Sequence, residues 1–195
     1  DLWVVSGSGW CTISTGKLDI ARGVGEWMQR LMDNQPNYPE ELWTVYSRSK
    51  GLITEVIDRD DFRYVLTRDE SRDQSFFHPG IAAGFLARLY MATAENKWLN
   101  LARKFMSFCD HVDDYHFKLL RAGKVGWAAS MMYTLTNEKV YRDMAIRVGK
   151  NLIEAQSDNG AWEWAASGKT GPNNDATAEL VVWLDEIHQA VGQDR

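Results

Sequence analysis

The sequence predicts an all-α protein of stacked helical hairpins, with a small β-like hairpin inserted before its longest helical stretch. Two observations predict this fold class. Apolar residues recur at spacings of three and four through most of the chain, as they do on the buried face of a helix. A repeat of 42 residues also appears when Gly84-Phe85 is set over Gly126-Trp127. Repeats of about 40 residues with two helices each are typical of stacked hairpins.

The first predicted helix covers residues 18–34, where Ile20, Val24 and Trp27 fall on one face and Pro36 follows the end. Between residues 43 and 75 the pattern changes to short β-prone runs around a polar turn at 47–51. We expect an irregular or β-hairpin insertion here, or a lid, with a solvated loop at 67–74.

After the insertion the helical period returns and predicts helices at about 80–94, 97–112, 118–135, 138–155 and 175–191. One hairpin cannot bury both of its apolar faces, so such units stack into a solenoid or close into an α/α-toroid. The predicted helices are too few for a closed double ring. We therefore treat residues 1–195 as one domain, a partial α/α-toroid that a missing chain segment or a partner chain of a homo-oligomer completes, or a smaller open bundle.

The composition of the chain limits the kinds of molecule that it is expected to bind. The chain is 45% hydrophobic and 25% charged, as soluble globular proteins are, and no apolar run is long enough to span a membrane. A net charge of -5 provides no basic surface for nucleic acid or acidic lipid. Two cysteines form at most one intramolecular disulfide, so we expect a cytoplasmic protein. Nine tryptophans suggest rings that line a cavity as well as fill a core.

The end of the helix predicted at 138–155 carries a second pattern. Gln156, Gly160 and Trp162 follow one another there, and the segment resembles the QW repeat of the terpenoid cyclase and protein prenyltransferase superfamily. In such a segment the Gln amide can bond the start of the next helix while the Trp ring closes the helix end, which is a structural role. Gln35 followed by Leu42-Trp43 is a looser echo. The resemblance covers residues 80–191 and implies an α/α-toroid with an aromatic cavity.

The last helix opens with Asp175-Ala176-Thr177-Ala178-Glu179, which resembles two segments of triterpene cyclases. In one alignment Asp175 occupies the proton-donor position, and in the other it is an acid near the pocket. Class II cyclases protonate an alkene or epoxide with a buried, neutral carboxylic acid. The resemblance thus implies Asp175 as the catalytic acid, with Glu179 beside it one turn on. Otherwise Asp175 is a helix cap or a first-turn acid.

Aromatic faces would stabilise the carbocation of such a reaction. His78 stands at a helix entrance and is a candidate base or ligand, or else a hydrogen-bonded, semi-buried histidine. With the rings that the resemblance places around the cavity, the expected substrate-binding residues are Phe77, His78, Trp127, Tyr133, Trp162 and Trp164.

Three functions remain open at this point. The first is an enzyme that cyclises or isomerises a small hydrophobic substrate, isoprenoid- or polyketide-like, by acid-initiated chemistry without a cofactor. The second is a carbohydrate-active α/α-barrel enzyme, a uronyl hydrolase, epimerase or lyase, in which Trp rings and carboxylates line the cavity. The third is a non-catalytic helical-repeat module that binds a partner on its concave face. Paired acids with aromatic platforms favour the second, and a wholly apolar pocket the first.

Three further patterns contain metal-ligand or acidic residue types. One spells a short acidic motif in the insertion, one places three acids at helical spacing, and one resembles the zinc ligands of lantibiotic cyclases. In the last, the expected Cys-His pair is split, and residues two apart on a helix point to different sides. We therefore expect no metal. The three sets are Asp58-Arg59-Asp60-Asp61; Asp110, Asp113 and Asp114; and Cys11, Cys109 and His111.

Overall fold

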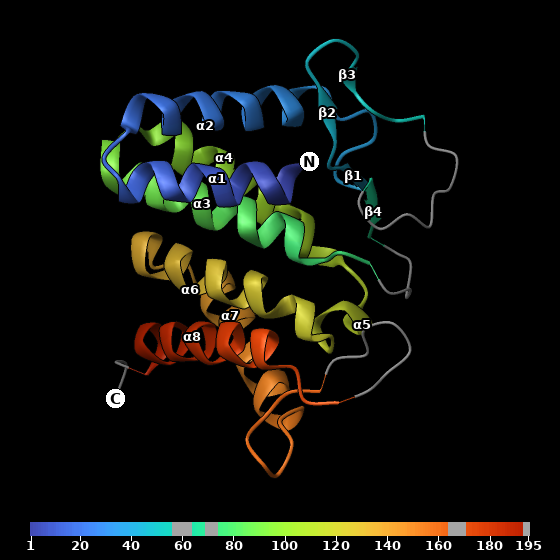
Figure 1. Ribbon diagram of the computed structural model, residues 1–195, viewed down its shortest axis with the longest axis vertical. Helices are drawn as coiled ribbons and strands as arrows, with labels where there is room; N and C mark the ends of the chain where they lie inside the picture. The colour runs from blue at the N-terminus through green and yellow to red at the C-terminus, as the bar shows by residue number, and fades with distance from the viewer. Residues whose placement is uncertain (56–63, 69–73, 164–170, 193–195) are drawn as a thin grey trace.

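The computed structural model describes residues 1–55, 64–68, 74–163 and 171–192. Its long helices form two layers (Figure 1). One layer contains α1 (Leu2–Ser14), α3 (Phe77–Thr93), α6 (Gly123–Thr136) and α8 (Asn174–Val191), in that order. The helices α2 (Leu18–Asp33), α4 (Asn96–Ser107) and α7 (Lys139–Glu154) pack against this layer. A 3-10 turn at Phe108–His111, a short α5 (Asp114–Phe117) and a second 3-10 turn at Leu120–Ala122 connect α4 to α6.

The hairpin repeat predicted from the sequence is confirmed by two joints of the same geometry. Ala94 ends α3 and Asn137 ends α6, each with a left-handed φ of 56°. The N–H of Ala94 donates to the Tyr90 carbonyl and that of Asn137 to the Tyr133 carbonyl, both at 2.7 Å. A left-handed residue at this position satisfies a free carbonyl and turns the chain out of the helix. Both joints therefore direct the following helix back along the one before it.

The helices of the second layer are also joined by a repeated ion pair. Arg22 of α2 binds Glu95, the residue before α4, at 2.6 Å. Arg103 of α4 binds Glu138, the residue before α7, at 2.7 Å. Each arginine thus reaches from one helix to the start of the next helix in its layer.

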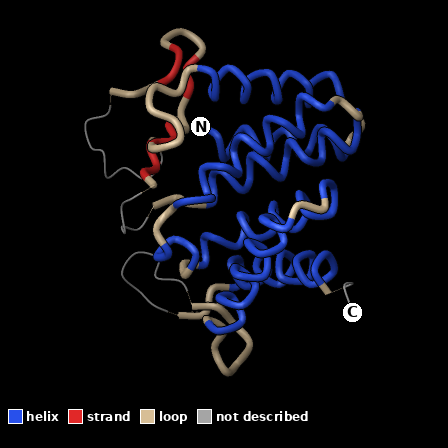
Figure 2. Tube along the Cα trace, turned by 180° about the vertical axis from the view of Figure 1, so that it is seen from behind, coloured by secondary structure: helices blue, strands red, loops and turns tan. Residues whose placement is uncertain are grey.

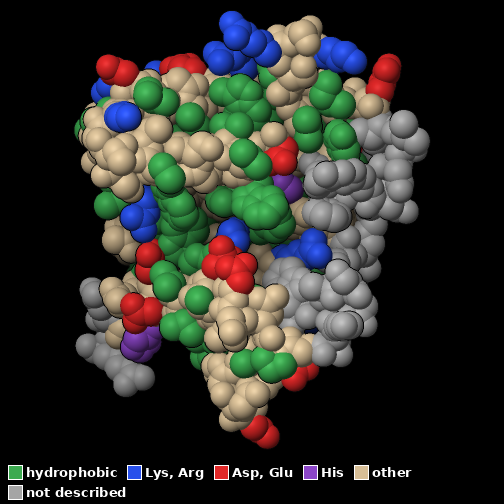
Figure 3. All heavy atoms as spheres, viewed as in Figure 1, with side chains coloured by type: hydrophobic (Ala, Val, Ile, Leu, Met, Phe, Trp, Pro, Cys, Tyr) green, Lys and Arg blue, Asp and Glu red, His purple; other side chains and the backbone are tan. Residues whose placement is uncertain are grey.

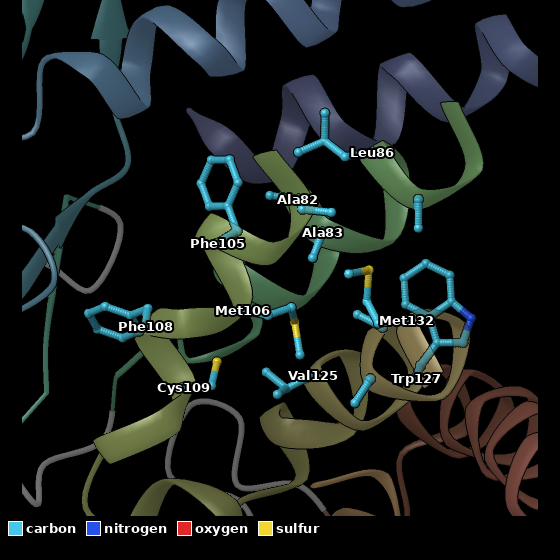
Figure 4. Close-up of a cluster of buried hydrophobic side chains, with 14 of the residues drawn as sticks. Ala82, Ala83, Leu86, Phe105, Met106, Phe108, Cys109, Val125, Trp127 and Met132 are labelled. Atoms are coloured by element: carbon cyan, nitrogen blue, oxygen red, sulfur yellow. The ribbon is translucent and has the colours of Figure 1, made fainter. Parts of the chain in front are cut away.

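The two layers differ in where their apolar side chains point. In α3 the residues from His78 to Ala87 are all buried, as expected for a helix with neighbours on most sides. Figure 4 shows Ala83 of α3, Met106 of α4 and Val125 of α6 in the space between these three helices. By contrast α4 buries one face and exposes charged residues on the other. Although α3 is apolar, no helix in the described part of the chain is long and apolar enough to cross a membrane.

Glycines bring the helices of the first layer close together. A Cβ built at Gly9 of α1 would lie 2.5 Å from the Phe85 ring of α3. One built at Gly84 of α3 would lie 2.1 Å from the Trp127 ring of α6. Because no side chain occupies these two positions, each helix accepts an aromatic ring of the next one. The Gly-aromatic pair that marks the sequence repeat is therefore a packing device.

Three boundaries differ from the sequence-based expectations. The helix α1 was not expected, because serine and glycine interrupt its apolar pattern. It forms with Asp1 as its cap, accepting from the N–H of Val4 at 3.0 Å, and it is held by packing on α2 and α3. The helix expected at 97–112 ends at Ser107 and continues as a 3-10 turn, and the one expected at 118–135 starts only at Gly123.

The expected β-like insertion is confirmed within the described residues. The solvated loop expected at 67–74 is wrong at its described ends, because Thr67 lies in a strand and Arg68 and Gln74 are buried. Strand β1 (Glu41–Trp43) pairs antiparallel with β4 (Val65–Thr67), and β2 (Tyr46–Ser47) with β3 (Gly51–Leu52). Tyr46 lies opposite Leu52 in the second pair, and Gly51 takes a φ of 73° beside the turn. Figure 2 shows the strands together at one end of the helices, beside the N-terminus.

Candidate functional site

A groove runs between α1 and α8, with α3 and α6 as its floor. On this face hydrophobic side chains lie beside acidic and basic ones (Figure 3). The end nearest the start of α8 is a hollow of about 350 Å³. Aromatic rings, two cations and two carboxylates line it together: Trp3, Phe77, Leu120, Arg121, Lys124, Asn173, Asp175, Ala176, Glu179, Leu180 and Trp183.

Asp175 and Glu179, the two expected catalytic acids, lie one turn apart on α8, and both are exposed. The cap of α8 is Asn173, whose side chain accepts from the N–H of Ala176 at 3.0 Å. Asp175 is therefore a first-turn acid and not the cap. A cyclase acid is expected in a buried, dry position, and Asp175 is instead exposed to solvent.

Lys124 of α6 is held in the middle of this hollow. Its Nζ lies 2.8 Å from the Glu179 carboxylate, 4.1 Å from the centre of the Trp183 ring and 5.5 Å from that of Phe77. Only 15% of the lysine side chain is exposed. Rings and a carboxylate thus fix one cation at the centre of the hollow, a placement that combines cation–π attraction with an ion pair.

Trp3 offers the accessible aromatic face of the hollow. Its side chain is 48% exposed, and its ring meets Phe77 edge to face at a centroid distance of 5.2 Å. Phe77, an expected substrate-binding residue, therefore lies in the hollow, where it supports Trp3. A half-exposed indole beside charged groups is a surface on which a flat or apolar ligand face can stack.

His78 lies behind Phe77 and does not line the hollow around Asp175. It is 1% exposed, its Nδ1 is 2.9 Å from the Ser75 carbonyl, and its ring stacks on Phe77 at 4.6 Å. Burial lowers the pKa of His78 to about 4, so the ring is neutral at pH 7. This histidine is fully buried, where a semi-buried one was expected, and it supports the wall of the site.

Two other expected rings lie further along the groove. Trp127 lines the adjoining hollow with Trp10, and its Nε1 donates to Glu186 at 2.6 Å. Tyr133 lines a hollow beyond that, near the end of α6. Both rings thus belong to the groove, but at positions away from Asp175.

Trp162 is buried at 0% exposure and forms part of the core. Its Nε1 donates to the Leu152 carbonyl at 2.8 Å and its backbone N–H donates to the Thr177 hydroxyl at 3.2 Å. The residue therefore ties the end of α7 to the start of α8, the structural role that the QW-like segment implies. Gln156, however, donates to the Gly160 carbonyl of its own turn at 2.8 Å, and not to the next helix. Trp164 lies outside the described residues.

Gln35 and Trp43, the looser match to that pattern, are joined by two hydrogen bonds. Gln35 Oε1 accepts from the backbone N–H of Trp43 at 2.8 Å, and Gln35 Nε2 donates to the Trp43 carbonyl at 2.9 Å. The same Nε2 also reaches the Leu31 carbonyl at 3.1 Å. Gln35 thus attaches β1 to the end of α2. The described residues of the insertion do not line the hollow around Asp175, so they do not act as its lid.

The expected acidic and metal-ligand patterns separate in space. Asp113 caps α5 by accepting from the N–H of Tyr115 at 2.8 Å, and Asp114 pairs with Arg147, so the three acids do not share one helix face. Cys11 is exposed on α1 and Cys109 is buried, where burial raises the pKa of its thiol. Within the described residues no group of three or more His, Cys, Asp or Glu side chains could hold a metal ion. The motif at residues 58–61 lies outside them.

Several groove residues escaped the sequence analysis, among them Trp3, Lys124 and Trp183. The high tryptophan content was the one signal that pointed to the two indoles. Lys124 and Glu179 are far apart in the chain, and their pairing results from the packing of α6 on α8.

Comparisons of this chain with protein-family models, with curated proteins and with solved structures found no match. The groove is therefore interpreted from its own geometry and chemistry.

Proposed function

We propose that this protein is a partial α/α-toroid whose groove binds and cleaves a carbohydrate chain containing uronic acids. The toroid part of the proposal is supported by the order of the helices. Hairpins stack in chain order, with α1, α3, α6 and α8 in one layer and α2, α4 and α7 against it. An inner and an outer layer of this kind is the arrangement of an open double ring.

One observation carries the functional part. Two exposed carboxylates, Asp175 and Glu179, lie one turn apart in the same hollow as the half-exposed ring of Trp3. A sugar ring has an apolar C–H face that stacks on an indole and hydroxyls that bond to charged side chains at its edge. An open hollow of mixed aromatic and charged character suits such a ligand better than a hydrocarbon.

The cations of the hollow favour an acidic sugar. Lys124 and Arg121 both line it. A guanidinium presents its donors in a planar fork that matches a carboxylate, and a lysine ammonium adds a compact charge. A uronic acid supplies the carboxylate, and Arg121 and Lys124 are placed to bind it while the two acids face the sugar ring.

The carboxylate pair supplies the chemistry of glycoside hydrolysis. One carboxylic acid protonates the leaving glycosidic oxygen, and the other carboxylate takes a proton from the water whose oxygen attacks the anomeric carbon. The bond from that carbon to the leaving oxygen breaks as the new one forms. Residues four apart on a helix have Cβ atoms about 5–6 Å apart, and the longer side chain of Glu179 can widen the distance between the two carboxyl groups to the roughly 6.5–9.5 Å that leaves room for the attacking water.

Acid-initiated cyclisation receives less support from the same site. Carbocation chemistry on a hydrocarbon needs a cavity that excludes water, and the hollow at Asp175 is open and lined by Arg121 and Lys124. The QW-like segment remains a likeness at the level of the fold, which does not determine a reaction.

The test is incubation with uronic-acid oligosaccharides, neutral oligosaccharides and an isoprenoid polyene, with products followed by mass spectrometry. We expect cleavage of the acidic oligosaccharides and its loss in Asp175→Asn and Glu179→Gln. Asp175→Asn changes an exposed side chain and should keep the free energy of unfolding within about 0.5 kcal/mol of the wild type. Glu179→Gln keeps an acceptor for Lys124 and should cost about 1 kcal/mol. Asp143→Asn, an acid of α7 paired with Lys139, is the matched control and should keep full activity.

Three outcomes would count against the proposal. Turnover of the polyene alone would favour the cyclase hypothesis. Binding of a ligand without turnover, unchanged by Glu179→Gln, would favour a non-catalytic module. Cleavage at the wild-type rate by both acid variants would remove Asp175 and Glu179 from the mechanism.

A further inference from the structure

The groove continues past the hollow that contains the acid pair. The next hollow shares Trp3, Lys124, Glu179 and Trp183 with it. A third shares Trp10, Trp127, Val182 and Trp183 with the second, and a fourth shares Arg88, Val182 and Glu186 with the third. The hollows therefore follow one another along α8, each next to the one before.

The length of the groove follows from the helix that borders it. Residues of α8 line the groove from Asp175 at one end to Gln189 at the other. At about 1.5 Å per residue this stretch is about 21 Å long, which is several times the width of a single sugar ring. A ligand of one or two rings would leave most of the groove empty.

A second aromatic and charged cluster lies in this further part of the groove. The rings of Trp10 and Trp127 meet edge to face at 4.7 Å. The Arg88 guanidinium lies over both, 5.4 Å from the centre of the Trp10 ring and 5.9 Å from that of Trp127. Glu186 accepts from Trp127 Nε1 through one oxygen, at 2.6 Å, and from Arg88 through the other, at 3.3 Å.

This cluster is built to hold Arg88 in one place. Both oxygens of Glu186 accept hydrogen bonds, and the guanidinium lies against the rings of the two indoles. The arginine side chain is nevertheless 44% exposed. A guanidinium has five N–H donors, so an oriented and accessible one can bind a carboxylate or hydroxyls of a ligand in the groove while it stays bonded to Glu186.

We propose that the groove binds an extended uronic-acid oligosaccharide at two subsites, one at Trp3 and Lys124 beside the acid pair and one at Arg88 over Trp10 and Trp127. This inference rests on the proposed function, since it names the length and anchoring of the same substrate. A cation over an indole, held by a glutamate of α8, recurs in both subsites: Lys124 over Trp183 with Glu179, and Arg88 over Trp10 with Glu186. This recurrence matches the repeating unit of such a chain. The second subsite adds affinity for long chains alone.

The experiment measures dissociation constants by titration calorimetry for oligogalacturonates of increasing length, from one unit to eight. Every protein in the series carries Asp175→Asn, so that the oligosaccharides bind without being cleaved. We expect the constant to fall with length until the chain reaches Arg88, and then to level off. Arg88→Ala should weaken binding of the long chains about tenfold, as expected for a lost charge-assisted contact, and leave the short ones unchanged. Trp3→Ala should weaken both.

Two further variants guard against an effect on folding. Arg88→Gln keeps hydrogen-bonding capacity towards Glu186 while removing the charge, and it should lose the same preference for long chains. Lys139→Ala removes a positive charge from an 84% exposed lysine of α7 and should behave as the wild type. Equal effects of Arg88→Ala on short and long chains, or no dependence on length, would overturn the two-subsite inference and leave the proposed function standing. Failure of every oligosaccharide to bind would instead overturn the proposed function.

Discussion

Replacing Gly84 with alanine tests the close approach of α3 to α6. The new Cβ would lie 2.1 Å and 2.3 Å from two atoms of the Trp127 ring, much closer than an ordinary contact. That ring is 2% exposed, and Glu186 accepts from its Nε1 at 2.6 Å. The indole therefore cannot move aside without losing a hydrogen bond and disturbing Trp10, which it meets at 4.7 Å.

The expected loss of stability is the difference between two effects. Overpacking of a well-packed core costs about 1–3 kcal/mol, and replacing glycine inside a helix returns roughly 0.5–1 kcal/mol. Because the 2.1 Å approach is so close, the upper part of the overpacking range applies, about 2–3 kcal/mol. Gly84→Ala should therefore lower the free energy of unfolding by about 1–2.5 kcal/mol. For a protein of this size that lowers the melting temperature by about 2–10 °C. Gly23→Ala is the matched control: Gly23 is exposed on α2, and an added Cβ would meet no atom within 4 Å.

Urea denaturation followed by circular dichroism measures both variants. Gly23→Ala should be more stable than the wild type by about 0.5–1 kcal/mol, and Gly84→Ala less stable. In a Trp127→Leu background the smaller side chain leaves room for the new Cβ, so Gly84→Ala should lower the free energy of unfolding little. The double-mutant cycle then measures the coupling energy between residues 84 and 127. If Gly84→Ala stabilises the protein as Gly23→Ala does, the inference that the Trp127 ring packs directly against Gly84 of α3 is refuted.

Three other perturbations have defined outcomes. Trp162→Ala should lower the free energy of unfolding by about 3–5 kcal/mol, because it removes a fully buried ring and the hydrogen bond to the Leu152 carbonyl; a change within the error of urea denaturation would contradict its role as a staple. Burial lowers the pKa of His78 to about 4 in the folded protein, so as the pH falls the unfolded chain takes up the proton at a higher pH than the folded protein does. The free energy of unfolding should therefore be highest above about pH 6.5 and fall by roughly 3 kcal/mol as the pH drops towards 4. His78→Asn, compared by denaturation across that range, should lose this part of the pH dependence. Arg103→Ala should cost less than about 1 kcal/mol, since its pair with Glu138 is 37% and 41% exposed; a loss above 2 kcal/mol in the same assay would show that the pair does more than join two helices.

The hairpins were predictable because their signals are local. The period of three and four, the breaks before Lys97 and Lys139 and the Gly-aromatic repeat all depend on neighbouring residues. The helix α1 was not, because its serines and glycines weaken the periodic pattern and its stability comes from packing on α2 and α3. The boundary at Gly123 was also missed, since no residue before it breaks a helix strongly.

The site was predictable only in part. Asp175, Glu179 and Phe77 line one hollow, and their role as site residues stays a prediction. Trp127 and Tyr133 lie further along the groove, and Trp162 lies in the core. Sequence patterns identify side chains that suit a site, but a buried tryptophan and a cavity-lining one share the same local pattern.

By itself, the amino-acid sequence determined the helical class, the repeating hairpin and the β-hairpin insertion, since each follows from the order of residues over short stretches. Only the tertiary structure decided that Asp175 faces solvent, that Lys124 pairs with Glu179, and that Trp3 and Trp183 border one groove. The last two relations join side chains of different helices, α6 with α8 and α1 with α8. They depend on how the helices pack, which the order of residues over short stretches does not encode.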